Sequence, residues 1–532
     1  MRVILGFPTL GSLVMRRRGT GLNGVVTVPL RPDAALCSAL RADLTSAGYT
    51  AAAVRAAWGP LADEATGRGL HGPALRALGE RSDPLAVLAR VLFLGGSAPV
   101  ADVDGALPAT GAVGLAALGL ATVDDDAVRP AALVRPQDYA DAAGSGHWWI
   151  ASDLDEAAVG GPLPTGHVLG VGGASLTLAS LQLDTPVDRA LDIGTGCGIQ
   201  AFRARRAARE VVATDISERA LQFTRLNALL NGLDGIELRR GSLFEPVAGE
   251  LFDRVVSNPP FVITPRVAGV PEYEYRDAGR AGDDLVAAFL TGVGEVLAPG
   301  GTAQLLGNWE YRDGQDGLDR VRAWIESSPV PLDAWVVERE RLDPLAYAEL
   351  WVRDGGTAPG SPDHARLVDA WLADFADRGV AEIGFGYLLM RRPRSGAPTL
   401  ARYERVGQPV TGALGPHLAA ALAAADRLAT LDDAALAASV LTVAPDVTEA
   451  RHHLPGAEAP TVIELRQGGG FGRVVDVDPA VAALVGACDG DLPVGVLLAA
   501  IAELLEVDAD ALREDALPRV RELVFTGFLR FA

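Results

Sequence analysis

Two short segments combine residue types whose spacing could do chemistry. The first, Asn258-Pro259-Pro260-Phe261, follows the apolar run Val255–Ser257. The Asn258 side-chain oxygen and the Pro259 carbonyl can accept hydrogen bonds from an NH2 group whose lone pair is delocalised, which makes its nitrogen more nucleophilic. Pro259 and Pro260 fix the turn, and Phe261 offers a ring face for stacking. We interpret these four residues as catalytic, acting on a planar nitrogen; the alternative is a simple turn that ends a strand.

The second segment, Asp192–Gly198, reads Asp-Ile-Gly-Thr-Gly-Cys-Gly. Its glycines let the backbone approach a ligand, and the turn leads into a helix N-terminus. Asp215 follows the next strand about 20 residues later, where a carboxylate can hold both ribose hydroxyls. The spacing is G-x-G-x-G, whereas dinucleotide sites use G-x-G-x-x-G. Because Asp192 is also placed to meet an amino group, the pattern favours S-adenosylmethionine as the cofactor.

Further candidate contacts come from the turn after the third strand, where the Ser242 hydroxyl and the Leu243 backbone could contact an adenine edge. We expect the cofactor to be bound by residues at four strand ends, namely Asp192, Gly194, Thr195, Gly196, Gly198, Asp215, Ile216, Ser242, Leu243 and Asn258. The reaction would be an in-line displacement governed by positioning. No Cys or His cluster has metal-ligand spacing, so no metal is predicted.

Elements that could position these segments alternate between strands and helices from about residue 147 to residue 392, which predicts a doubly wound α/β sheet. Five short apolar runs are the expected strands: Arg189–Ile193, Glu210–Thr214, Ile236–Arg240, Arg254–Ser257 and Thr302–Leu306. A helix at Pro362–Arg378 and a strand at Ala381–Met390 would complete the sheet. Each candidate segment directly follows one of these strands.

Flanking regions differ from this pattern. Residues 32–145 and 399–532 show mainly helical periodicity. In the first region, strand-like Ala121–Val123 and Ala127–Leu133 flank a turn at Asp124–Asp126, and helices that close in a small hairpin predict a winged-helix form; the same form is one interpretation of the second region. Residues 146–392 would be the α/β domain, and the Pro/Gly/Ser-rich stretch after it a linker. Residues 1–31 are interpreted as a disordered N-terminal extension, because the basic cluster follows the apolar run instead of preceding it, as a secretory signal would require.

The motifs Asp192–Gly198, Asp215 and Asn258–Phe261 together resemble those of class I methyltransferases with an Asn-Pro-Pro-aromatic motif. This group includes the release-factor glutamine, ribosomal RNA guanine-N2 and adenine-N6 methyltransferases. The resemblance covers about residues 167–392 and implies a Rossmann-like seven-stranded domain that uses S-adenosylmethionine. Phe261 is closer to the guanine-N2 branch, whereas Tyr275–Leu285 is similar to a glycine-containing loop of the glutamine branch.

Composition narrows the range of acceptors. The chain of 532 residues carries a formal net charge of −21, which disfavours extended contact with phosphates, although several arginines cluster near residue 205. No apolar run is long enough to span a bilayer, and the three cysteines lie far apart, so a cytoplasmic protein is expected. The first hypothesis is methylation of a protein side-chain amide, such as glutamine. The alternatives are an exocyclic amine of RNA or DNA and, third, a non-catalytic binding module.

Overall fold

The computed structural model describes residues 28–141, 143–159, 163–267, 270, 280–357, 359–394, 396–410 and 412–532. Residues 1–27 of the predicted N-terminal extension and residues 275–279 of the loop at 275–285 lie outside the described residues. The chain forms two compact units. The first comprises Met1–Ala179 and Pro186–Gly396, and the second comprises Ser180–Thr185 and Ala397–Ala532.

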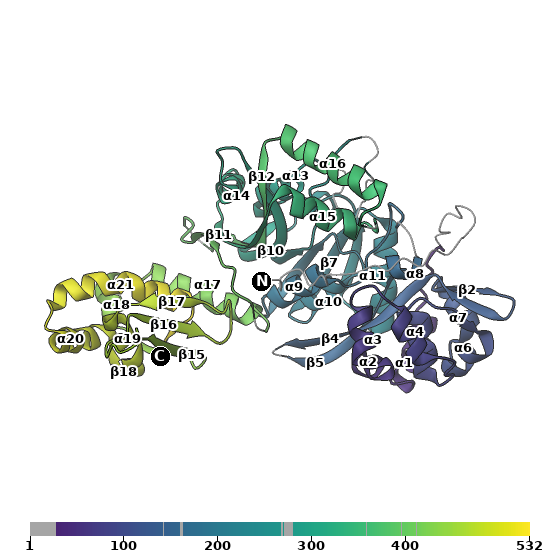
Figure 1. Cartoon of the computed structure of the whole chain (residues 1–532), viewed down its shortest axis with the longest axis horizontal. Coiled ribbons are helices and arrows are strands. Elements are labelled where there is room, and N and C mark those ends of the chain that lie inside the picture. Colours follow the sequence, from purple (N-terminus) through teal and green to yellow (C-terminus); the bar gives the residue numbers. More distant parts are fainter. Residues whose placement is uncertain are drawn as a thin grey trace. The chain divides into compact units, whose positions relative to one another are not determined.

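The strands that the first unit contributes to the central mixed sheet follow the order β11-β12-β10-β9-β6-β7-β8. Figure 1 labels β11, β12, β10 and β7 of these strands. β10, β9, β6, β7 and β8 run parallel, and β12 is antiparallel to both of its neighbours. The strands are β6 (Val187–Ile193), β7 (Ala208–Asp215), β8 (Ile236–Arg240), β9 (Phe252–Ser257), β10 (Leu297–Arg312), β11 (Asp333–Leu342) and β12 (Val380–Arg391). This is the α/β architecture that the alternation of patterns predicts.

Helices of this sheet begin at side chains that cap them. Ser217 Oγ accepts the N–H of Ala220 at the start of α11, and Asp343 and Ser361 cap α15 and α16 in the same way. α11 ends at Gly232, whose φ of 63° suits a residue without a side chain. The helices are α10 (Ile199–Arg205), α11 (Glu218–Asn231), α13 (Asp284–Gly292), α14 (Gly317–Glu326), α15 (Pro344–Asp354) and α16 (Pro362–Asp377).

The N-terminal region adds helices and two sheets to this unit. A three-stranded sheet has the order β1-β3-β2, and β4 and β5 form a long antiparallel hairpin. The elements are α1 (Ala34–Ser46), α2 (Ala51–Trp58), α3 (Pro60–Thr66), α4 (Gly72–Leu78), α5 (Pro84–Leu88), the π-helix η1 (Ala89–Phe93), β1 (Ala98–Pro99), α6 (Val100–Ala106), α7 (Gly111–Leu118), β2 (Ala121–Asp124), β3 (Ala127–Pro130), β4 (Ala132–Asp141) and β5 (Gly144–Asp153). The small hairpin expected from Ala121–Val123 and Ala127–Leu133 is present as β2 and β3, whereas the long hairpin β4–β5 was not expected, and the region is therefore not purely helical.

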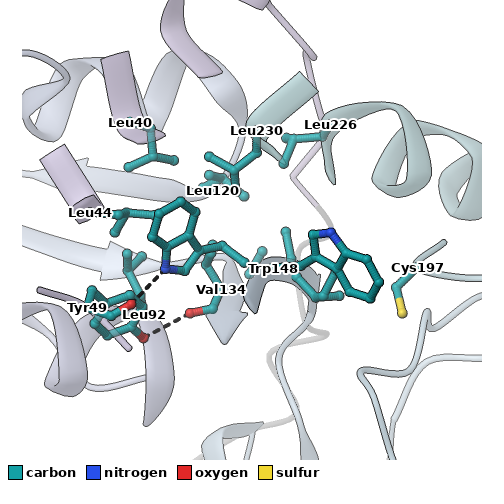
Figure 2. Close-up of a cluster of buried hydrophobic side chains, with 14 of the residues drawn as sticks. Leu40, Leu44, Tyr49, Leu92, Leu120, Val134, Trp148, Cys197, Leu226 and Leu230 are labelled. Atoms are coloured by element: carbon teal, nitrogen blue, oxygen red, sulfur yellow. Dashed lines mark hydrogen bonds between the residues drawn. The ribbon is translucent and has the colours of Figure 1, made fainter. Parts of the chain in front are cut away.

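One hydrophobic core joins this N-terminal region to the central sheet. Leu40 and Leu44 of α1 lie beside Leu226 and Leu230 of α11, and all four are fully buried (Figure 2). The hairpin contributes Trp148 to the same core. The N-terminal region therefore packs as part of the first unit.

The second unit contains two three-stranded sheets, with the orders β18-β14-β19 and β15-β16-β17. Its elements are β13 (Ala401–Arg405), α17 (Gly415–Ala429), α18 (Asp433–Ala437), β14 (Val440–Val443), β15 (Val447–His452), β16 (Val462–Gln467), β17 (Val474–Val477), α19 (Pro479–Ala487), β18 (Asp489–Pro493), α20 (Val494–Leu505), α21 (Ala509–Phe525) and β19 (Leu529–Phe531). The expectation of a mainly helical region was again incomplete. The earlier segment Ser180–Thr185 joins this unit, and the N–H of Leu414 donates to the Ser180 carbonyl over 2.9 Å.

Tyr49 tests the contact between the helical region and the hairpin. Its hydroxyl donates to the carbonyl of Val134 over 2.9 Å inside the core (Figure 2). In Tyr49→Phe that carbonyl loses its donor, so we expect the free energy of unfolding to fall by about 1–3 kcal/mol. Chemical denaturation measures this change. Stability equal to that of the wild type would contradict a structural role for the bond.

Candidate active site

The register of the parallel strands brings the candidate segments to one edge of the sheet. Ile193 of β6 lies opposite Ser257 of β9 and Thr214 of β7. Because β6, β7 and β9 end at the same level of the sheet, the residues at or just after their ends, namely the glycine turn, Asp215 and Asn258, are neighbours. This is the carboxyl edge, where open α/β sheets bind their ligands.

A cavity of about 470 Å³ opens at this edge. It is lined by most of the residues that the sequence predicted, namely Gly194, Thr195, Gly196, Asp215, Ile216, Ser242, Leu243, Asn258, Pro259, Pro260 and Phe261. Asp192 and Gly198 are not among the residues that line it. Gly198 starts α10 with a φ of 93° and has a supporting role in the turn.

Asp192 lies fully buried at the end of β6. Burial raises the pKa of Asp192 to about 7. A carboxyl group in this environment resists ionisation unless a cation approaches it. The structure therefore places Asp192 behind the turn, next to the cavity wall.

The glycine turn is fixed by hydrogen bonds to the backbone of β7 and to the Asp215 side chain. The N–H groups of Gly194 and Thr195 both donate to the Thr214 carbonyl. One carboxylate oxygen of Asp215 accepts the N–H of Gly196 over 2.9 Å, and the other accepts that of Ser217 over 2.8 Å. These bonds fix the direction of a carboxylate that lines the cavity.

The residues at this edge fit S-adenosylmethionine. Gly194 and Gly196 have φ angles of 73° and 56°, and no atom lies within 4 Å of where a Cβ would stand on either. Asp215 could hold the ribose hydroxyls, and the side chains of Ile216 and Leu243 give apolar surface for an adenine. Leu243 itself has a φ of 48°, a left-handed conformation that costs energy in a residue with a side chain.

Asn258 is fixed from one side only. Its Nδ2 donates to Ser175 Oγ of α9 (Gly173–Leu181) over 3.3 Å. Its Oδ1 is buried and has no hydrogen-bond partner among the described residues. Phe261 packs against Phe385, with 5.6 Å between the ring centroids. The site thus offers an acceptor oxygen beside an aromatic wall.

Sequence reasoning missed several residues around the cavity. Asp153, at the end of β5, lines it, accepts the N–H of Val168 over 2.9 Å and pairs with Arg219. Burial lowers the pKa of the neighbouring His167. Asp153 meets its partners only through the fold, so no local spacing could indicate it.

Other kinds of site find less support. Among the described residues, no group of three or more His, Cys, Asp or Glu side chains is placed to hold a metal ion. No helix in the described part of the chain is long and apolar enough to cross a membrane.

Comparison with known families identifies three regions. A family model described as the methyltransferase small domain matches residues 172–271. Two models described as domains of unknown function, DUF7059 and DUF7782, match residues 46–131 and 421–531. The methyltransferase match contains the glycine turn, Asp215 and Asn258–Phe261.

Individual relatives match in the same part of the chain. A release factor glutamine methyltransferase of Deinococcus radiodurans is 38% identical over 125 residues, which are 22% of this chain and 44% of that protein. A ribosomal protein uL3 glutamine methyltransferase of Bordetella pertussis is 32% identical over 168 residues, 30% of this chain and 56% of that protein. A provisionally named protein N5-glutamine methyltransferase of Methanocaldococcus jannaschii is 30% identical over 135 residues, 25% of this chain and 68% of that protein. The chain spans about half the length of the first two relatives.

Asp192 predicts a pH-dependent stability. The carboxyl has a pKa near 3.8 when unfolded and about 7 when buried, so between these values the native protein holds a proton that the unfolded chain has released. Stability therefore falls as the pH rises through this window. The free energy of unfolding of the wild type, without cofactor, should fall between pH 5 and pH 8 by on the order of 2–3 kcal/mol more than that of Asp192→Asn, because the variant has no carboxyl to ionise. Chemical denaturation at both pH values measures this, with exposed Asp188→Asn as the control; parallel pH profiles would refute the burial effect.

Asp215 predicts a loss of cofactor affinity. Removing a charged acceptor that faces the cavity should cost about 2–3 kcal/mol of binding, so Asp215→Ala should raise the Kd for S-adenosylmethionine about 30-fold to 150-fold. Asp215→Asn keeps one acceptor oxygen and should lie between this variant and the wild type. Calorimetry measures both. An unchanged Kd in Asp215→Ala would remove this residue from the site.

Proposed function

The chain belongs to the class I S-adenosylmethionine-dependent methyltransferases, and from this premise we propose that it methylates the side-chain amide nitrogen of a glutamine in a protein substrate. The enzyme class rests on the family match and on the curated relatives. The glutamine acceptor goes beyond the enzyme class and is the part that we propose. It is supported by the relatives named for release factors and for ribosomal protein uL3.

One observation carries the chemistry, the buried and unpartnered Oδ1 of Asn258 at the cavity wall. A buried acceptor without a donor costs free energy, and such a cost is usually explained by a ligand. An amide NH2 group would supply the missing donor. Together with the Pro259 carbonyl, Asn258 would hold both protons and direct the lone pair of nitrogen toward the methyl group.

The remaining steps need only positioning. The cofactor, when bound, supplies a methyl group on a positively charged sulfur. Asn258 and Pro259 would orient the acceptor nitrogen, and Phe261 would restrict the planar amide to one face. The nitrogen loses a proton as it gains the methyl group, and the open side of the cavity gives that proton a path to water.

The charge distribution supports a protein acceptor over a nucleic acid. The arginine cluster that could have met phosphates is occupied by carboxylates: Arg203 and Arg206 pair with Asp141, Arg205 with Asp234, and Arg209 with Asp188. The pKa of Asp141 is lowered to about 2 by its hydrogen bond to Arg206 and by Arg203. A phosphate backbone would have to displace these partners.

A transfer assay separates the acceptor classes. The purified protein is incubated with labelled S-adenosylmethionine and cell lysate that has been treated with nuclease, with protease or with neither. Under this proposal the label survives nuclease, disappears with protease, and appears as N5-methylglutamine in mass spectrometry. Label that is lost with nuclease instead would assign an exocyclic amine of RNA or DNA as the acceptor. No transfer to any fraction would favour the non-catalytic module.

Asn258 gives the sharpest test of the mechanism. Interactions made mainly in the transition state affect kcat and leave ground-state binding unchanged. We expect Asn258→Ala to lower kcat roughly 100-fold to 1,000-fold and to change the Kd for the cofactor less than about threefold. Phe261→Tyr keeps the ring and should be mild. Steady-state transfer of labelled methyl measures both; an Asn258→Ala variant that kept more than about a tenth of kcat would rule out the acceptor role.

A further inference from the structure

Two asparagines on α11 pair with the edge of β5 as a neighbouring strand would. Asn231 Oδ1 accepts the N–H of Trp149 over 2.9 Å, and its Nδ2 donates to the Trp149 carbonyl over 2.8 Å. Asn227, one turn earlier, repeats this with Ala151, at 2.7 Å and 2.9 Å. Because Trp149 and Ala151 are two apart on a strand, they face the same side, and one helix face satisfies both.

Only Asn227 extends this pairing to the cofactor turn. Its Nδ2 also donates to the carbonyl of Cys197 over 2.9 Å, so the two hydrogens of one amide are shared between Ala151 and Cys197. Asn227 is fully buried. One turn back along α11, Thr224 Oγ donates to the carbonyl of Gly196 over 3.0 Å. Two successive carbonyls of the turn are therefore held by α11.

The strand β5 reaches the cavity from the opposite direction. Two residues after Ala151, Asp153 lines the cavity and accepts the N–H of Val168, which is itself a lining residue. The hairpin of the N-terminal region thus supports the cavity at Val168 and, through Asn227, at Cys197. A loop that binds a ligand through its backbone gains affinity when that backbone is already ordered.

We propose that Asn227 is a positioning residue for the cofactor, which ties the glycine turn to β5 and makes cofactor affinity depend on the N-terminal hairpin. The proposal rests on the cofactor of the family and is independent of which acceptor is methylated. It assigns the N-terminal region a part in the cofactor site, although none of α1–α7 carries a predicted cofactor-binding residue.

Asn227 and Asn231 form a matched pair for the test. Each makes three hydrogen bonds, two of them to β5; the third goes from Asn227 to Cys197, whereas from Asn231 it goes to the carbonyl of Asn227. Asn227→Ala and Asn231→Ala therefore remove the same number of hydrogen bonds, including two to β5 in each case. They differ in whether the cofactor turn loses its anchor.

The measurement is the Kd of the full-length protein for S-adenosylmethionine by calorimetry, with the melting temperature recorded in parallel. We expect both variants to melt earlier, but only Asn227→Ala to bind the cofactor at least 10-fold more weakly, with Asn231→Ala within about threefold of the wild type. In a transfer assay, Asn227→Ala should raise the KM for the cofactor while kcat at saturation stays within about threefold. Equal changes of Kd in the two variants, or an unchanged Kd in Asn227→Ala, would overturn the proposal.

A milder substitution covers the case in which Asn227→Ala does not fold. Thr224→Val retains the shape of the side chain and removes only the bond to Gly196, so it loosens the turn without touching β5. In the double variant Thr224→Val/Asn231→Ala, the Kd for S-adenosylmethionine should rise by no more than the product of the fold-changes in the two single variants. In Thr224→Val/Asn227→Ser, the Kd should rise by more than the product of the fold-changes in its own two single variants. Additivity in both doubles would contradict the coupling. A wild-type protein that failed to bind S-adenosylmethionine would instead contradict the family cofactor itself.

Discussion

The turn between β6 and α10 must keep three glycines in left-handed conformations while its backbone lines a cavity, and the elements around it serve this constraint. Thr214 and Asp215 hold the N–H groups of the turn from β7, while α11 holds its carbonyls through Thr224 and Asn227. Buried backbone groups that lack such partners would cost more than the turn could recover by binding. The site is thus built from hydrogen bonds to backbone as much as from functional side chains.

The parts of the fold that could be predicted are those with local signals in the sequence. Short apolar runs identified the parallel strands, and because such strands end at a common edge, residues near 194, 215, 242 and 258 could be placed together from their positions in the chain. The hairpin β4–β5 and the small sheets of the C-terminal region escaped prediction, since pairing between strands depends on partners outside any local window. Asn227 resembles any polar residue of a helix until β5 is in place.

The acidic composition has a local counterpart in the structure. Arg203 and Arg206 at the end of α10 pair with Asp141 at the end of β4, which links the hairpin to the central sheet, while Arg205 pairs with the exposed Asp234 in the loop before β8. Ion pairs that are partly buried resist screening by salt better than exposed pairs. The acidic net charge of −21 is therefore matched locally, because the clustered arginines are paired with aspartates.

The second unit includes Ser180–Thr185, six residues that comprise the last two of α9 and the four that follow it, just before β6. The chain therefore contributes six residues to the second unit, then forms the strands of the central sheet, and enters the second unit again after Gly396. A gene fragment that ends at the apparent linker would keep those six residues and lose the body to which they belong, and a fragment that begins there would lack part of its own fold. For this protein, a continuous fragment that contains all of the second unit must therefore also contain Pro186–Gly396 of the first.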